Sequence, residues 1–227
     1  MWHTELTIWK SISNFARELG ISEKLIERAK LDYDKLVSQY AKTRRLVNRK
    51  FFSKLDASLS MQEFFRWGFY YFPCFYQLVF SGWGHTGLRE LRFYLEASIR
   101  AYYIDSNFRE MAYNDKVKML NIFKPYKLEE DLKSLQTLTG KELDDLKNKI
   151  RFEDMLKGLP KRKEITIFYS DLCNYVHLSE QAQTDALRDN LLNIALQLPV
   201  YENDNKMLHK TFNYSIYLLL ESLKLEM

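Results

Sequence analysis

Apolar residues recur every three or four positions along most of the chain, which is the spacing of one buried helix face. The first such run predicts a helix over residues 4–19 that ends at Gly20, because glycine readily takes the left-handed conformation that closes a helix. Ser22 is a favourable N-cap for a second helix, whose apolar positions continue toward Leu55. We therefore expect residues 1–57 to form a two-helix N-terminal extension.

The pattern after this extension predicts a helical bundle domain over residues 58–227. Ser58 or Ser60 is expected to cap its first helix, which Pro73 should bend because proline lacks a backbone donor. We expect the first two helices of this domain and the helix that carries His177 to form a central antiparallel bundle. The pattern predicts helices over 61–80, 87–105, 164–178 and 182–198, shorter charged helices between Asn107 and Pro160, and a last helix that follows Pro199 and the polar run 202–205 and ends near Leu225.

Composition supports the same fold class. Only 7 Gly and 4 Pro occur in 227 residues, so the chain has few of the tight turns that a sandwich, barrel or propeller needs. Its 46% hydrophobic residues are enough for a sizeable core. Two cysteines make no disulfide framework, and the N-terminal residues lack the pattern of a signal peptide. We expect an all-α protein located in the cytoplasm.

One stretch has the length of a membrane span. Residues 67–88 carry no formal charge over 22 positions. Its strictly apolar part, 69–80, is however only 12 residues long and rich in tyrosine. This favours a buried core helix, and no membrane span is expected.

The helix predicted over 87–105 carries its charges in one narrow stripe. At about 100° per residue, the stripe contains His85, Arg89, Arg92, Glu96 and Arg100. Apolar residues cover most of the remaining surface, and charges on such a helix are costly unless they are paired. Two interpretations stay open: an ion network that docks this helix against another helix or a second subunit, or an anion site in which guanidinium groups bind phosphate oxygens.

A second polar stripe follows the predicted helix over 164–178. Asp171, Asn174 and His177 stand three residues apart, so a carboxylate, an amide and an imidazole could face one cleft. His177 is the leading acid or base, because the unperturbed pKa of histidine suits proton transfer near neutral pH. The alternative is an ordinary solvated helix face.

The stretches SGWGHTGLRELRFYLEASIRAYYI (81–104) and FYSDLCNYVHLS (168–179) together resemble prokaryotic helical families related to the HEPN superfamily. The resemblance covers residues 60–180 and implies a helical bundle, a homodimer formed through it and, in catalytic members, RNA cleavage without metal. Catalytic members carry an Arg shortly before the His, whereas Ser170, Asp171 and Leu172 stand there in this chain. An Arg of the preceding stripe would have to replace it. The candidate catalytic residues are His177, Arg92, Arg100, Glu96, Asp171 and Asn174.

A basic segment holds the whole positive excess of the chain. Residues 41–55 contain six basic residues and no acid, which leaves 28 basic against 30 acidic residues elsewhere. Such a segment could follow a phosphate backbone, with Phe51 and Phe52 as stacking surfaces, or it could be the solvated face of a helix. The candidate nucleic-acid-binding residues are Lys42, Arg44, Arg45, Arg49, Lys50 and Lys54.

Motifs for metal or nucleotide chemistry are weak or absent. Cys173 and His177 stand at a zinc-compatible spacing, but the sequence holds no second pair with a recognised spacing. It also lacks a phosphate-binding loop, a serine-hydrolase elbow and an HExxH motif, so we expect no cofactor. Two functions remain as hypotheses: a HEPN-like protein that binds RNA or cleaves it as a metal-independent endoribonuclease, or a non-catalytic interaction or oligomerisation module.

Overall fold

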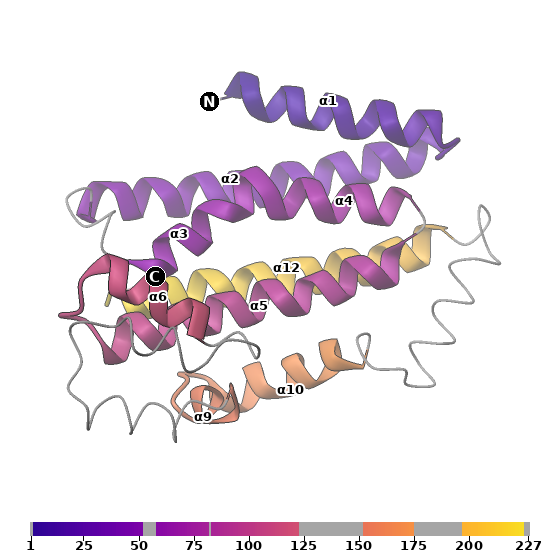
Figure 1. Cartoon of the computed structure of the whole chain (residues 1–227). Coiled ribbons are helices and arrows are strands. Elements are labelled where there is room, and N and C mark those ends of the chain that lie inside the picture. The colour runs from indigo at the N-terminus through magenta and orange to yellow at the C-terminus, as the bar shows by residue number, and fades with distance from the viewer. Residues whose placement is uncertain (1, 52–57, 82, 123–151, 175–196, 225–227) are drawn as a thin grey trace.

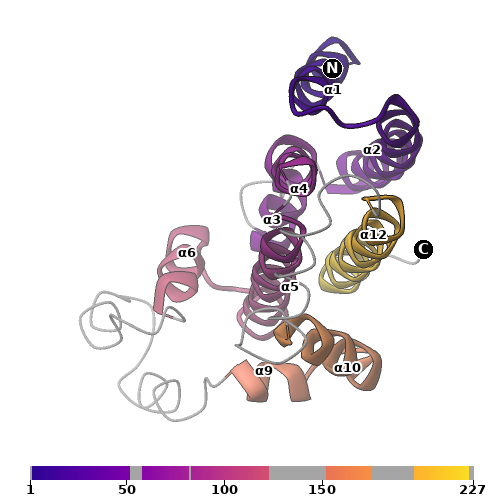
Figure 2. The same cartoon turned by 90° about the vertical axis from the view of Figure 1, so that its right-hand side faces the viewer.

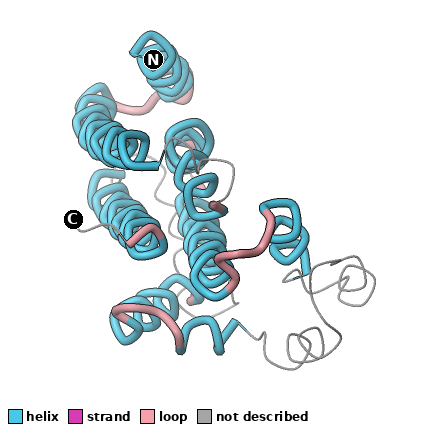
Figure 3. Tube along the Cα trace, turned by 90° about the vertical axis from the view of Figure 1, so that its left-hand side faces the viewer, coloured by secondary structure: helices cyan, strands magenta, loops and turns pink. Residues whose placement is uncertain are grey.

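The computed structural model describes residues 2–51, 58–81, 83–122, 152–174 and 197–224. Within these ranges every regular element is a helix, which confirms the all-α prediction (Figure 3). The elements are α1 (Trp2–Glu18), α2 (Glu23–Phe51), α3 (Leu59–Arg66), the π-helical turn η2 (Trp67–Tyr71), α4 (Phe72–Phe80), α5 (Gly84–Asn107), α6 (Tyr113–Ile122), α9 (Phe152–Lys157), α10 (Arg162–Cys173) and α12 (Gln197–Ser222).

The helices are stacked in layers around α5. Figure 1 shows α1 along one edge, then α2 with α4, then α5 with α12, and finally α9 with α10 at the opposite edge. Figure 2 shows that α6 stands to one side of α5. Because α5 packs against α12, α3, α4, α10, α6 and α9, its side chains are surrounded on most sides.

The first two helices begin and end close to the predicted positions. Gly20 has a φ of 75° and follows α1, as expected of a glycine that ends a helix. The backbone N–H of Leu25 donates to Ser22 Oγ at 3.4 Å, which confirms Ser22 as a cap. Buried residues of α1 and α2, such as Ile12 and Leu36, belong to the same hydrophobic cluster as those of the later helices.

The helix predicted over 61–80 is divided at η2. The N–H of Phe72 donates to the carbonyl of Trp67, five residues back, so the wide turn lies just before Pro73 rather than at it. In a regular helix the ring of Pro73 would clash with the carbonyl of Phe69, and the wider turn gives it room. Ser58 caps α3 by accepting the N–H of Met61 at 3.3 Å, as expected.

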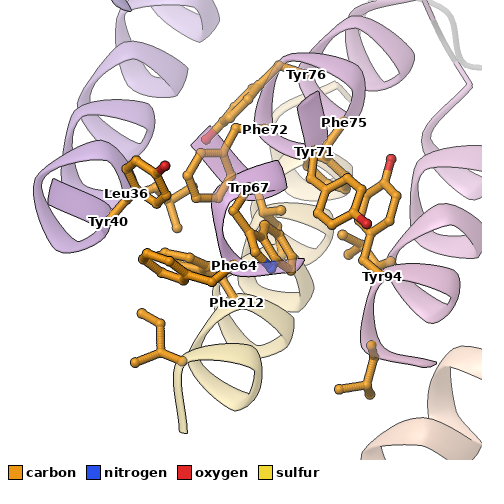
Figure 4. Packing of buried hydrophobic residues seen from close by; sticks show 14 of the residues in the cluster. Leu36, Tyr40, Phe64, Trp67, Tyr71, Phe72, Phe75, Tyr76, Tyr94 and Phe212 are labelled. Carbon is orange, nitrogen blue, oxygen red and sulfur yellow. The ribbon is translucent and has the colours of Figure 1, made fainter. Parts of the chain in front are cut away.

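Aromatic side chains fill the centre of the fold at this turn (Figure 4). Trp67 is fully buried and lies edge-on to Tyr71 and Tyr94, with ring centroids 5.2 and 5.7 Å away. Tyr71 and Tyr94 stack at 3.8 Å, and Phe212 of α12 lies 5.1 Å from Trp67. The uncharged stretch 67–88 therefore supplies core side chains, as predicted, and no described helix is long and apolar enough to cross a membrane.

Gly68 is the point at which η2 touches α2. A Cβ at this position would lie 2.7 Å from ring atoms of Tyr40, which is buried and stacks on Phe64 at 4.9 Å. We expect Gly68→Ala to lower the free energy of unfolding by about 2 kcal/mol, because the packed ring cannot move away. Urea denaturation followed by circular dichroism measures this loss. Gly87→Ala is the control, since a Cβ there lies 3.4 Å from Phe75, an ordinary contact; equal losses for both variants would contradict the expected clash.

The last helix begins earlier than predicted and is more central. Helix α12 starts at Gln197, Pro199 is tolerated in its first turn, and the polar run 202–205 lies within the helix. This part of the prediction is wrong because Asp204 and Asn205 are buried on the inner face rather than placed in a loop. Tyr76 of α4 donates to Asn205 Oδ1 at 3.2 Å. Helices α5 and α12 approach closely enough for Ser98 Oγ of α5 to donate to Ser215 Oγ of α12 at 2.9 Å.

Candidate functional site

The charged stripe of α5 is a set of paired side chains. Arg92 Nη2 lies 2.8 Å from Glu96 Oε1, and Arg100 Nη2 lies 3.3 Å from Glu96 Oε2. The spacing of four residues places both guanidinium groups on the same helix face as the carboxylate. Arg89 is exposed and lies 3.9 Å from Glu90, so it is outside this set. The His85 side chain is not among the described residues.

Helices α9 and α10 complete the arrangement. The Tyr169 hydroxyl donates to Glu96 Oε1 at 2.6 Å and accepts from Arg92 Nε at 3.2 Å. Arg92 also lies over the Tyr169 ring, and Arg100 over the Phe152 ring, each with its central carbon 5.6 Å from the centroid. The Phe152 and Tyr169 rings are 4.9 Å apart. We call these five residues the Arg–Glu–Tyr cluster.

The cluster keeps a surplus of positive charge. It contains two arginines and one carboxylate, and only 8% of the Glu96 side chain is exposed, against 18% for Arg92 and 24% for Arg100. Burial and the Glu96 charge raise the pKa of Tyr169, so its hydroxyl stays a neutral donor. Burial alone would lower the pKa of Arg92, but the Tyr169 hydrogen bond and Glu96 raise it above the usual value. Among the described residues, the buried Arg100 Nε has no hydrogen-bond partner.

The structure brings together only part of the predicted catalytic set. Arg92, Glu96 and Arg100 lie together, whereas Asp171 and Asn174 of the predicted polar stripe are exposed at the end of α10. His177 lies outside the described residues. The α10 side chain that reaches the arginines is Tyr169, which stands on a different face of the helix from Asp171.

Sequence reasoning missed Tyr169 and Phe152 as partners of the stripe. Helical periodicity places Tyr169 beside the buried Phe168, but its hydrogen-bond partner Glu96 is 73 positions away. The available signal was chemical: an unbalanced Arg–Glu–Arg stripe needs donors or anions from another element. That requirement does not say which helix supplies them.

The basic segment lies at the C-terminal half of α2. Lys42 and Arg45 are exposed, while Thr43 and Val47 are buried on the opposite side, as expected for an amphipathic helix. Arg44 lies over the ring of Phe65 in α3, with its central carbon 5.7 Å from the ring centroid. The side chains of Arg49, Lys50 and Phe51, and all of Phe52 and Lys54, lie outside the described residues.

The part of the chain that the structure describes offers no cluster of three or more His, Cys, Asp or Glu side chains able to hold a metal ion. Cys74 and Cys173 are both free thiols. Since His177 is outside the described residues, its predicted pairing with Cys173 stays a prediction.

Comparison with known proteins identifies no relative: no protein-family model, no curated protein and no solved structure matches the chain. The HEPN resemblance of residues 81–104 and 168–179 therefore stays a prediction.

Proposed function

We propose that the protein binds RNA through the C-terminal half of α2. The observation that carries this proposal is the concentration of charge, because residues 41–55 hold six basic residues and no acid. Lys42 and Arg45 present their charges to solvent on a long helix, and the partly exposed Arg44 adds a third cation on the side that faces Phe65 of α3. We call Lys42, Arg44 and Arg45 the basic surface. Such a surface attracts a phosphate backbone over several ångströms and gains affinity from released counterions.

RNA is the nucleic acid we assign because of the HEPN resemblance. The phosphate contacts alone would serve DNA equally well, since they carry no information about the sugar. A DNA oligomer of the same sequence therefore belongs in every binding series.

The Arg–Glu–Tyr cluster supports binding without cleavage. Both guanidinium groups are already engaged by Glu96, and Arg92 is held in addition by Tyr169. Arginines that stabilise charge on a reacting phosphate must be able to point at it. With both guanidinium groups held by Glu96, the cluster fits the alternative function of a non-catalytic module in which α9 and α10 dock against α5.

The binding proposal is tested by reversing charge on the basic surface. We expect Lys42→Glu with Arg45→Glu to weaken RNA affinity for every sequence tried and to reduce the slope of log K against log salt by about 1.5, because about two phosphate contacts are lost. Fluorescence anisotropy of a labelled oligomer at several salt concentrations measures both quantities. The matched control is Lys10→Glu with Lys24→Glu, which makes the same charge change at exposed positions on α1 and at the start of α2.

Equal weakening by both double variants would show that only net charge matters and would remove the basic surface from the proposal. The bound RNA is also incubated with chelator and analysed by gel. Intact RNA is expected, whereas cleavage by the wild type that is lost in His177→Ala would replace the binding function with the endoribonuclease hypothesis.

A further inference from the structure

An exposed aromatic side chain, Phe69, stands on η2, the turn that contacts α2. Phe69 belongs to η2 and is 57% exposed, as is its neighbour Tyr70 at 62%, whereas Trp67 and Tyr71 of the same turn are buried. Trp67 is fully buried, and Tyr71 is held by its stack on Tyr94 and by donating to Glu63 Oε2 at 2.7 Å. The backbone that carries Phe69 is therefore fixed on both sides. π-Helical turns are rare, and those that do occur are often found at functional sites.

Two contacts place Phe69 next to α2. Gly68 lies directly against the Tyr40 ring, so the backbone of η2 touches α2 one residue before Phe69. Phe65 lies under Arg44 of the basic surface. Because Phe69 follows Phe65 by four residues, the two rings share one side of the α3–η2 segment. The η2 turn contacts α2, and Figure 2 shows α4, which follows η2, next to α2.

We infer that Phe69 is a base-stacking platform and that the RNA bound by this protein is single-stranded. This inference rests on the proposed function. In a duplex the faces of the bases are covered by their neighbours, whereas a single strand can lay an unstacked base on an exposed ring. The basic surface would hold the phosphates while Phe69 takes a base, which is the combination found in proteins that bind single strands without sequence preference.

The sequence also predicts stacking surfaces at Phe51 and Phe52, and these stay predictions. They follow the basic residues along the chain, but their side chains lie outside the described residues. Phe69 lies on the same side of the α3–η2 segment as Phe65, the ring that Arg44 of the basic surface covers. Phe93 of α5 offers the matched comparison, since it is 44% exposed and also lies beside an arginine, Arg92, at 5.6 Å.

The experiment measures anisotropy of three labelled probes of roughly 16 nucleotides: oligouridylate, a backbone of the same length without bases, and an RNA duplex. We expect the wild type to bind oligouridylate on the order of tenfold more tightly than the baseless backbone. Phe69→Ala and Phe69→Leu should remove this difference while leaving the salt slope unchanged. Phe69→Trp should keep it, because a larger ring still stacks, and Phe93→Ala should leave all three affinities as in the wild type.

Each failure has a separate meaning. If the wild type binds the baseless backbone as tightly as oligouridylate, and charge reversal at Lys42 and Arg45 still weakens binding, stacking is wrong and RNA binding stands. If only Phe93→Ala removes the preference for oligouridylate over the baseless backbone, the stacking residue is Phe93 of α5 and the assignment of Phe69 is wrong. If the wild type binds none of the probes but binds vesicles containing phosphatidylserine in a way that depends on Phe69, the ligand is a membrane surface, and both the inference and the proposed function fall.

Discussion

Replacing Asp105 with alanine is expected to lower the free energy of unfolding by about 4 kcal/mol, the largest single loss we expect in this protein. The buried Asp105 carboxylate accepts the backbone N–H groups of Leu59 and Ser60 at 3.2 and 2.8 Å and the Ser58 hydroxyl at 2.8 Å. It also lies 3.3 Å from Lys116 Nζ, which is equally buried. Removing the carboxylate takes away a negative charge at the start of α3 and leaves the Lys116 charge without its carboxylate partner.

Urea denaturation followed by circular dichroism measures the effect of Asp105→Ala. Asp34→Ala is the matched control, because Asp34 also pairs with a lysine but 53% of its side chain is exposed. An exposed pair contributes little, so the control should lose less than about 1 kcal/mol. Asp105→Asn keeps acceptor oxygen for the backbone donors and is expected to fall between the two. Similar losses of unfolding free energy for Asp105→Ala and Asp34→Ala would show that the buried Asp105–Lys116 pair contributes no more to stability than an exposed pair.

Glu96→Ala is expected to cost about 3 kcal/mol of unfolding free energy. The variant leaves Arg92 and Arg100 without the carboxylate that balances them and leaves the Tyr169 hydroxyl without its short acceptor. Buried charge that has lost its partner is the main source of the loss, and the unmade hydrogen bond adds to it. The same denaturation measurement applies.

Two further variants test whether the loss of unfolding free energy comes from the Arg–Glu–Tyr cluster or from any change of charge on α5. Glu90→Ala removes a carboxylate from the same helix whose nearest arginine is 3.9 Å away, and should change stability by less than about 1 kcal/mol. Tyr169→Phe should cost about 1 kcal/mol alone, and together with Glu96→Ala the two losses should fall short of their sum because the residues share one hydrogen bond. Strict additivity would mean that α10 does not depend on this contact.

Both predictions concern residues that dock helices, and this bears on function. Asp105 connects α5 to α3 and α6, and Glu96 connects it to α10. Among the described residues, the side chains that bond to Asp105 or Glu96 do not include those of Lys42, Arg45 or Phe69. Loss of stability and loss of the proposed RNA binding should therefore separate in the variants, which allows binding to be measured on folded protein.

The sequence by itself determined the features that depend on neighbours within a few residues. Helical periodicity and the scarcity of Gly and Pro predict the all-α class, Gly20 predicts the end of α1, and Ser22 and Ser58 predict caps. The pairing of Glu96 with arginines four residues away follows from the same local geometry. These features need no knowledge of the tertiary fold, because one turn of helix already places the groups together.

Only the tertiary structure decided which surfaces meet. Periodicity shows which face of a helix is buried but not what covers it, so Tyr169 as the partner of Glu96 and α12 as a close neighbour of α5 could not be read from the chain. The polar run 202–205 looked like a loop because its burial depends on Tyr76, more than a hundred residues earlier. The contact between η2 and α2 could not be read from the chain for the same reason, because Gly68 lies against the Tyr40 ring only once these segments pack together.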